Sequence, residues 1–296
     1  MSRSAVREQT ILERIRAFTR TQTGIDFISQ TVQYILLILG AILIMIPFLW
    51  MISTSFKSSF QVWDPDSWWP DPFVLDNYRR PFEVLPMKTF FKNTMITVIA
   101  AVIGVPLSSS LVAYGFARYQ APGSTLLFIL LLGTMMLPGQ VTLIPTFILY
   151  RKLGWYDTLL PLTVPCFLAS PFYVFLLRQF YAGISKDVEE AAIIDGCGTL
   201  RLWWQILLPM TKPALATVVI FEFLGKWNDF FGPLIYLETL EKFTLALGMR
   251  MFQTQFTIEY GPMMALATLL MLPCVLLFFF CSRYFIQGIN LTGSKG

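Results

Sequence analysis

The chain has 296 residues, of which 55% are apolar, 16% are aromatic and only 14% are charged. This composition excludes an ordinary soluble domain and indicates an integral membrane protein. The chain has no histidine, which excludes histidine metal sites and a histidine general base, and its net charge of +4 reflects membrane topology and implies no nucleic-acid partner.

Six segments are long and apolar enough to cross a bilayer, which takes about 20 residues of helix. They lie at about 32–53, 94–117, 124–149, 158–180, 213–237 and 260–283. The strands of a β-barrel are excluded, because they alternate apolar and polar side chains over only about ten residues. No linker or low-complexity tract divides the chain, so we expect one all-α transmembrane domain over 1–296.

The distribution of Lys and Arg orients the six spans. If both termini are cytoplasmic, the inside segments carry more Lys and Arg than the outside segments, and the basic stretch before the first span adds to this bias. We therefore expect both termini inside the cell. The external segment 53–93 then carries several aromatic residues, which form either an interfacial belt or a surface for an external partner: Trp63, Trp68, Trp69 and Tyr78.

A polar segment with helix signals separates the fourth and fifth spans. Ser185 is suited to cap a helix, and acidic residues follow in the first turns, where the helix dipole favours them: Asp187, Glu189 and Glu190. Gly196 and Gly198 then end this helix. Thr199 is suited to cap a second short helix that runs to Ile206.

The end of this segment leads into the fifth span. Pro209 and Pro213 end the second helix and begin the span. Four apolar side chains are expected to pack the base of the resulting helix–turn–helix against the membrane helices: Trp203, Trp204, Ile206 and Leu207. These features fit two interpretations equally, a surface on which another protein docks or a long amphipathic connector.

The spacing within this segment resembles a known motif. Glu190-Ala191-Ala192 is followed by Gly196 and then by Ile206-Leu207-Leu208-Pro209. This pattern resembles the "EAA" loop of permease subunits of ABC importers, the cytoplasmic element that docks onto the ATPase. The resemblance implies that residues 183–212 are a coupling loop whose ATPase-coupling residues are Glu190, Ala191, Ala192, Asp195, Gly196, Ile206 and Pro209.

Three further stretches resemble one subclass of these permeases. They are Leu137–Pro145, Lys226–Leu234 and the tail Arg283–Gly296. All three are similar to the second permease of the sugar and glycerol-phosphate importers, as in the maltose system. The resemblance implies a core of six helices, a homologous permease as heterodimer partner, an ATPase dimer, an extracytoplasmic solute-binding protein, and a C-terminal tail that approaches the ATPase.

The fifth span carries charges that are costly inside a bilayer. Glu222, Lys226 and Asp229 have a spacing that puts them on one face of an unbroken helix. This face either lines the path of the solute or forms a charge cluster that fixes helix packing or heterodimer pairing. The candidate path residues are Gln140, Trp227, Asn228 and Asp229, with the aromatic ring of Trp227 stacking on a sugar.

Together these features predict a multi-pass permease subunit in a prokaryotic inner or plasma membrane that imports a sugar or sugar-like solute. The chain contains no G-x-x-x-x-G-K-[ST] sequence, so we expect no cofactor on it, no enzymatic activity, and ATP and Mg²⁺ on the partner ATPase. An ABC permease for another solute class is the alternative. An ion-coupled secondary transporter has only the charged fifth span in its favour, and a membrane enzyme lacks a nucleophile–base pair.

Overall fold

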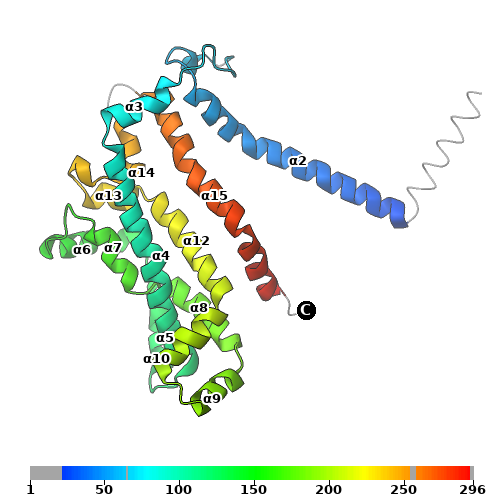
Figure 1. The fold of residues 1–296 in the computed structure, drawn as a ribbon, viewed down its shortest axis with the longest axis vertical. Helices are drawn as coiled ribbons and strands as arrows, with labels where there is room; N and C mark the ends of the chain where they lie inside the picture. The colour runs from blue at the N-terminus through cyan, green and yellow to red at the C-terminus, as the bar shows by residue number, and fades with distance from the viewer. Residues whose placement is uncertain (1–21, 65, 254–257, 294–296) are drawn as a thin grey trace, which may run out of the picture.

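The computed structural model describes residues 22–64, 66–253 and 258–293, and within these ranges the fold is helical (Figure 1). The only strand-like pairing in the described part is an isolated bridge between Gln253 and Ile258. The all-α class is therefore confirmed. The α-helices are α2 (Gln22–Ser55), α3 (Asp76–Val84), α4 (Met87–Arg118), α5 (Ser124–Thr134), α6 (Gly139–Lys152), α7 (Leu160–Thr163), α8 (Pro171–Gly183), α9 (Lys186–Ile194), α10 (Thr199–Leu202), α11 (Leu208–Met210), α12 (Lys212–Trp227), α13 (Phe231–Tyr236), α14 (Leu245–Met249) and α15 (Tyr260–Gly293).

Four described helical segments are each long and apolar enough to cross a membrane: Ser29–Ser55, Met87–Arg118, Leu160–Gly183 and Tyr260–Cys281. Two bent pairs raise the number to six if each pair is one span. These are α5 with α6, bent by 97°, and Thr199–Met210 with α12, bent by 81°. The six predicted apolar segments are largely helical, but three of them contain a break: 124–149 at 135–138, 158–180 at 168–170, and 213–237 at 228–230.

The predicted third span, 124–149, breaks at 135–138, between α5 and α6. Pro138 is extended, with φ −60° and ψ 134°, and becomes the N-cap of α6. Proline has no N–H and disfavours a helical conformation at the residue before it, so the helix is interrupted here although the segment is apolar throughout. The predicted fifth span, 213–237, also ends early, because α12 stops at Trp227 and a short α13 follows.

The centre of the bundle is α4, which packs most extensively against α8 and α12. It begins at Met87, earlier than the predicted 94. The prediction placed the start too late because polar residues in the first turns of the helix interrupt the apolar run. Close to its middle, Gly104 lies so near the backbone of Cys166 that an added Cβ would be 2.9 Å from that carbonyl oxygen. Small residues allow such close approach between membrane helices.

The same part of α4 also bonds the chain where the fourth span is interrupted, between the 3-10 helix η2 (Val164–Phe167) and α8. Ser108 Oγ accepts a hydrogen bond from the Ala169 N–H at 3.0 Å, and Ser109 Oγ accepts one from the Ser170 N–H at 2.9 Å. These hydroxyl groups satisfy backbone donors that the interrupted helix leaves free. The fourth span is thereby fixed to α4 at the point where its own helix is interrupted.

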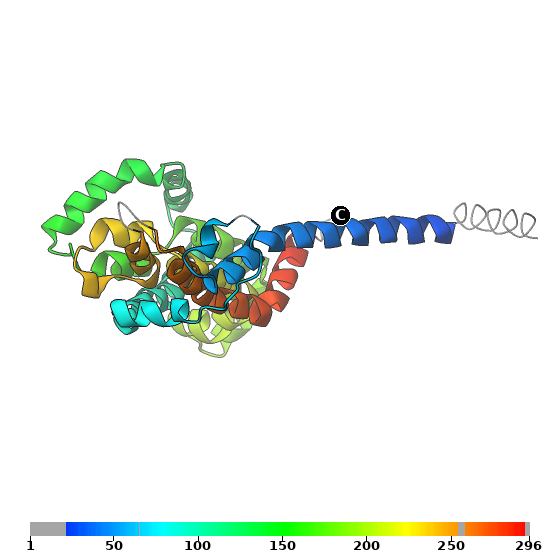
Figure 2. The ribbon, with the colours of Figure 1, turned by 90° about the horizontal axis from the view of Figure 1, so that it is seen from above.

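Helix α2 leaves the bundle at one end and extends away from it (Figures 1 and 2). The most apolar window of Ser29–Ser55 has no buried residue, and Leu37 and Leu43 are 66% and 70% exposed. Side chains that are apolar on every face of a helix need lipid or another protein around them. The chain alone does not supply that cover for α2.

The two ends of the bundle carry different connections. The coupling loop, with α9 and α10, lies at one end, whereas α3 and α14 lie at the other (Figure 1). One cluster of buried residues lies near the coupling loop and joins α4, α8 and α12. It includes the fully buried Val174, Leu177 and Val218. A second cluster, around Phe90 and Trp227, joins α4, α12 and α15 closer to the opposite end.

Candidate functional site

The first helix of the coupling loop has the ends that the sequence predicts. Ser185 is the N-cap of α9, and its Oγ accepts a hydrogen bond from the Asp187 N–H at 3.2 Å. Gly196 ends the helix with a φ of +79°, a left-handed conformation that glycine adopts without steric cost. The backbone N–H of Cys197 then donates to the Ala192 carbonyl at 2.9 Å, which closes the turn.

The second helix differs from the prediction at both ends. Its N-cap is Gly198, and Thr199 is the first helical residue and caps nothing. The helix also continues beyond Ile206, through a π-helical turn (Trp203–Leu207) into α11. The Leu208 N–H donates to the Trp203 carbonyl in that wider turn. This turn shifts the backbone hydrogen-bond register by one residue just before Pro209, which has no N–H to donate. The proline is thereby accommodated, and the chain stays helical until Thr211.

The base of the coupling loop packs into the membrane helices through part of the predicted set. Leu207 is fully buried, Trp203 and Ile206 pack against the same core, and Leu202 joins them. Trp204 is 53% exposed, so its predicted role in the base is wrong. Trp203 and Leu207 are four residues apart and therefore share the helix face that packs against the core, whereas Trp204 lies on a different face and is exposed.

The outer face of α9 carries the residues of the Glu-Ala-Ala motif. Glu190, Ala191 and Asp195 are exposed, and within the described ranges no side chain pairs with the Glu190 carboxylate. Ala192 is only 7% exposed because it faces α4 and α8. A groove of about 380 Å³ separates the two helices of the loop and is lined by Val188, Ala191, Asp195, Arg201, Gln205 and Ile206.

Sequence reasoning missed the residue pair that fixes α9 to the bundle. Arg118, in the last turn of α4, forms an ion pair with Glu189, and the two side chains are only 7% and 13% exposed. Arg118 Nη2 also donates to the Ile184 carbonyl at 2.7 Å. The sequence marks Arg118 only as a positive charge at the end of a span. No local pattern links it to an acid in a distant loop.

The candidate path residues do not form one site. Trp227 is 4% exposed, its Nε1–H donates to the Leu270 carbonyl at 2.9 Å, and its ring stacks on Phe223 at 5.6 Å. The predicted stacking of Trp227 on a sugar is therefore wrong, because the ring belongs to the packed interior. Gln140 is exposed in the first turn of α6.

The other two candidates lie where α12 ends. Asn228 is exposed and uses its Nδ2 to donate to the Leu224 carbonyl at 2.8 Å. Asp229 lies beyond the helix, where its Oδ1 accepts from the Gly232 N–H at 3.0 Å and its Oδ2 lies 3.8 Å from Lys226 Nζ. The helix is thus not unbroken, because α12 ends at Trp227 before it reaches Asp229. Glu222 and Lys226 are still one turn apart on α12, and Asp229 pairs with Lys226 from beyond the helix end, which supports the alternative of a charge cluster.

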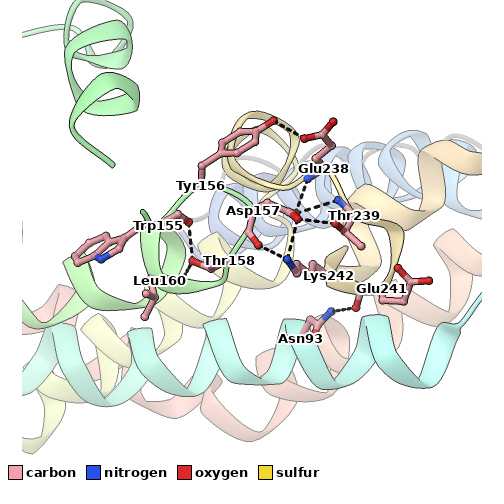
Figure 3. Close-up of polar contacts among 10 residues, drawn as sticks. All are labelled: Asn93, Trp155, Tyr156, Asp157, Thr158, Leu160, Glu238, Thr239, Glu241 and Lys242. Atoms are coloured by element: carbon pink, nitrogen blue, oxygen red, sulfur yellow. Dashed lines mark hydrogen bonds and ion pairs between the residues drawn. The ribbon is translucent and has the colours of Figure 1, made fainter. Parts of the chain in front are cut away.

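At the opposite end of the bundle, Asp157 joins two loops that are far apart in the sequence: its own loop and the one that contains Glu238, Thr239 and Lys242 (Figure 3). Its carboxylate accepts from the backbone N–H groups of Glu238 and Thr239 at 2.9 and 3.0 Å and from the Thr239 hydroxyl at 2.5 Å. Lys242 Nζ lies 2.8 Å from the same carboxylate. We call these four residues the Asp157 clamp.

The clamp should respond to acid. Burial raises the pKa of Asp157, but the hydrogen bonds from Lys242 and Thr239 and the two backbone N–H groups outweigh burial and hold the pKa well below its usual range. The clamp's stabilisation is therefore complete above about pH 4, the usual pKa of an unfolded aspartate, and is lost as the pH falls through the lowered pKa of the folded protein.

We expect Asp157→Asn to lower the stability of the detergent-purified protein by about 1–3 kcal/mol at pH 7, because a charged acceptor of several hydrogen bonds is lost. The difference from the wild type should shrink as the pH falls below about 4, because the carboxylate of the unfolded wild type takes up a proton there while the folded one, with its lowered pKa, stays charged. Thermal unfolding at several pH values measures both. Glu241→Gln is the control, because the Glu241 side chain is exposed and the contact from Asn93 reaches its backbone carbonyl. A difference that does not depend on pH would contradict the lowered pKa.

No part of the described chain offers a metal site, since no group of three or more Cys, Asp or Glu side chains could hold an ion. The chemistry that remains is exposed polar surface at one end of a helical membrane bundle, carried by a helix–turn–helix with a free carboxylate. This arrangement defines a polytopic helical membrane protein that presents a helix–turn–helix with an exposed acidic face at one end of its bundle.

Comparison with known proteins places the chain in a family. It belongs to the binding-protein-dependent transport system inner membrane components, whose pattern matches residues 23–291. It is 32% identical to the diacetylchitobiose uptake system permease protein NgcG of Streptomyces coelicolor over 263 residues, which cover 88% of this chain and 87% of the relative. It is also 32% identical to the arabinooligosaccharides transport system permease protein AraQ of Halalkalibacterium halodurans over 265 residues, which cover 86% and 93%.

A solved structure shares the fold. A chain of a bacterial ABC transporter involved in the import of the acidic polysaccharide alginate superposes with a TM-score of 0.78 at 23% identity, over 90% of this chain and all of that one. The protein is accordingly a multi-pass inner-membrane component of a transport system, and its relatives are permease subunits rather than enzymes.

Proposed function

We propose that this chain pairs with a homologous permease to form the translocation path of an ABC importer for a sugar, with ATP hydrolysed on a separate chain. The relatives named for diacetylchitobiose and arabinooligosaccharides support an oligosaccharide as the solute. The observation that carries the coupling is the free Glu190 carboxylate on α9, which is presented outward by a loop whose base is buried.

The geometry of α9 suits docking against another protein. Glu190 lies at the middle of the helix, and the small side chain of Ala191 beside it lets a partner surface approach closely. A basic cleft on an ATPase subunit is the complementary surface for this carboxylate. Closure of an ATPase dimer around bound ATP and Mg²⁺ would draw two such loops together and turn the path outward, and hydrolysis would return it inward.

The remaining partners are proposed from exposed surface. The apolar sides of α2 support a homologous permease as a neighbour within the bilayer. At the opposite end of the bundle, Trp63 and Trp69 are 72% and 81% exposed. Trp63 packs edge-on against Tyr260 with ring centroids 5.3 Å apart, so it is held in place as part of an external surface. An extracytoplasmic solute-binding protein is the proposed occupant of that surface.

The test is purification of the tagged chain from its native membrane, followed by reconstitution into liposomes with whatever co-purifies. The expected result is a second permease, an ATPase, and uptake of labelled oligosaccharide that requires ATP inside the vesicles together with the binding protein. A panel of unlabelled sugars and polyol phosphates then identifies the solute class by competition. Uptake that persists without ATP and collapses when an ion gradient is dissipated would favour a secondary transporter instead.

A further inference from the structure

Helix α4 contacts the first helix of the coupling loop through a buried ion pair. The Arg118 guanidinium pairs with Glu189 of α9 and also donates to the Ile184 carbonyl at the end of α8. Both side chains are almost fully buried, at 7% and 13% exposure. Removing one partner of a buried pair leaves an uncompensated charge, so this contact holds α9 in one position relative to α4.

The same helix contacts the second helix of the coupling loop. Ser110, about two turns before Arg118 on α4, is fully buried. Its hydroxyl accepts from Trp203 Nε1 at 3.0 Å and lies 2.6 Å from the hydroxyl of the fully buried Tyr181. Both helices of the loop are therefore fixed to the last three turns of α4.

The other end of α4 holds the connection 238–245. Asn93 Nδ2 donates to the carbonyl oxygens of Glu241 and Phe243 at 2.9 and 3.0 Å (Figure 3 shows the first). Thr94 Oγ1 accepts from the Leu245 N–H at 2.8 Å. This connection also contains the Asp157 partners Glu238, Thr239 and Lys242, so α4 reaches the Asp157 clamp through it.

We propose that α4 transmits movement of the coupling loop to the connection 238–245, and that the Arg118–Glu189 pair is the joint at which α9 acts on α4. Glu190 faces outward and its neighbour Glu189 faces α4, so a force on the docking face reaches α4 within one residue. The helix is continuous over 32 residues, which is about 48 Å at 1.5 Å per residue. Arg118 and Glu189 are positioning residues.

This proposal rests on the proposed docking of the coupling loop to an ATPase, and its test separates the two. The complete reconstituted importer is compared for wild type, Arg118→Gln and Glu189→Gln by the amount of ATPase that co-purifies and by the number of ATP molecules hydrolysed per solute imported. We expect the ATPase to remain bound and to hydrolyse ATP, while the ratio of ATP to solute rises at least about 10-fold, the range of a typical coupling energy between two sites.

A variant with the two charges exchanged and a variant at the opposite end of α4 test the proposal further. The double variant Arg118→Glu with Glu189→Arg restores the pair, so the ratio should return to within about three-fold of wild type, as expected when two residues act only through each other. Asn93→Ala, at the far end of α4, should raise the ratio as well. Combined with Arg118→Gln it should add little, because both changes interrupt one linkage.

The matched control is the Arg79–Glu83 pair of α3, which has the same chemistry but side chains 77% and 55% exposed. Arg79→Gln and Glu83→Gln should leave the ratio unchanged, because exposed ion pairs contribute little. If Arg118→Gln does not fold, Arg118→Lys keeps the charge but lacks the guanidinium that contacts Glu189 through Nε and the Ile184 carbonyl through Nη2, and it should raise the ratio to a smaller extent.

The outcomes distinguish the two proposals. A wild-type chain that recovers no ATPase contradicts the proposed function. A wild type that binds ATPase, together with folded Arg118 variants that keep the wild-type ratio, overturns the joint and leaves the proposed function standing. Loss of ATPase binding in Arg118→Gln that the charge-swapped variant does not restore would also overturn it, because the pair would then serve only to fold the docking face.

Discussion

Glu190→Lys is expected to lower ATP-dependent uptake by about 100-fold or more and to reduce recovery of the ATPase with the tagged chain. Glu190 is exposed on α9 and has no partner among the described side chains, so its carboxylate is available to a basic partner surface. Losing one partner of a charge pair at an interface costs about 2–5 kcal/mol, and reversing the charge adds repulsion. Co-purification and uptake into proteoliposomes measure the two effects.

The control for Glu190→Lys is the same reversal at Glu241, an exposed glutamate on the connection at the opposite end of the bundle. This variant should recover the ATPase as the wild type does. The thermal stability of Glu190→Lys should also match the wild type, because the Glu190 carboxylate pairs with no side chain in the described part of the protein. Undiminished ATPase recovery with Glu190→Lys would mean that the coupling loop is a connector.

Trp227→Ala is expected to lower the stability of the protein by about 3–5 kcal/mol, the usual cost of removing a large buried aromatic side chain. The ring is 4% exposed, bonds the Leu270 carbonyl of α15, stacks on Phe223 and packs edge-on against Phe91 at 6.4 Å. It therefore joins α12 to α4 and α15. Thermal unfolding in detergent measures the loss.

The same variant separates packing from solute binding. In the fraction of Trp227→Ala that folds, the KM for solute uptake should be unchanged, because the ring is packed among the buried residues that join α4, α12 and α15. Trp204→Ala is the matched control, since Trp204 is 53% exposed and its loss should leave the melting temperature within a degree or two of wild type. A stable Trp227→Ala protein with a raised KM would restore the stacking role that the sequence suggested.

Local rules account for the parts of the coupling loop that were predicted well. A serine before a run of acids predicts an N-cap, and glycine is the residue that most easily adopts the left-handed conformation at a helix end. Ser185 and Gly196 have these roles in the structure. Each role depends on neighbours within a few positions, and those neighbours are visible in the sequence.

The apolar segments were also visible, but their straightness was not. Hydropathy averages over a window, so it registers the segments around Pro138 and Asn228 as continuous. Pro138 breaks the predicted third span into α5 and α6, and α12 ends at Trp227 with Asn228 as its C-cap. Trp227 was assigned to a solute path because its sequence neighbours suggested it, whereas its burial depends on α4 and α15, which are distant in the sequence.

By itself, the sequence determined that this is an all-α membrane protein with a capped helix–turn–helix between two spans, because length, apolarity and helix ends are local properties, and the resemblance of the Glu190–Pro209 spacing to a known motif indicated the permease class. Only the tertiary structure decided which charges meet. The Arg118–Glu189 pair and the Asp157–Lys242 pair join residues that lie 71 and 85 positions apart, and the first is buried. Such pairs form because packing of the helices brings distant segments together, which also excludes water from the Arg118–Glu189 pair, and no pattern along the chain records that.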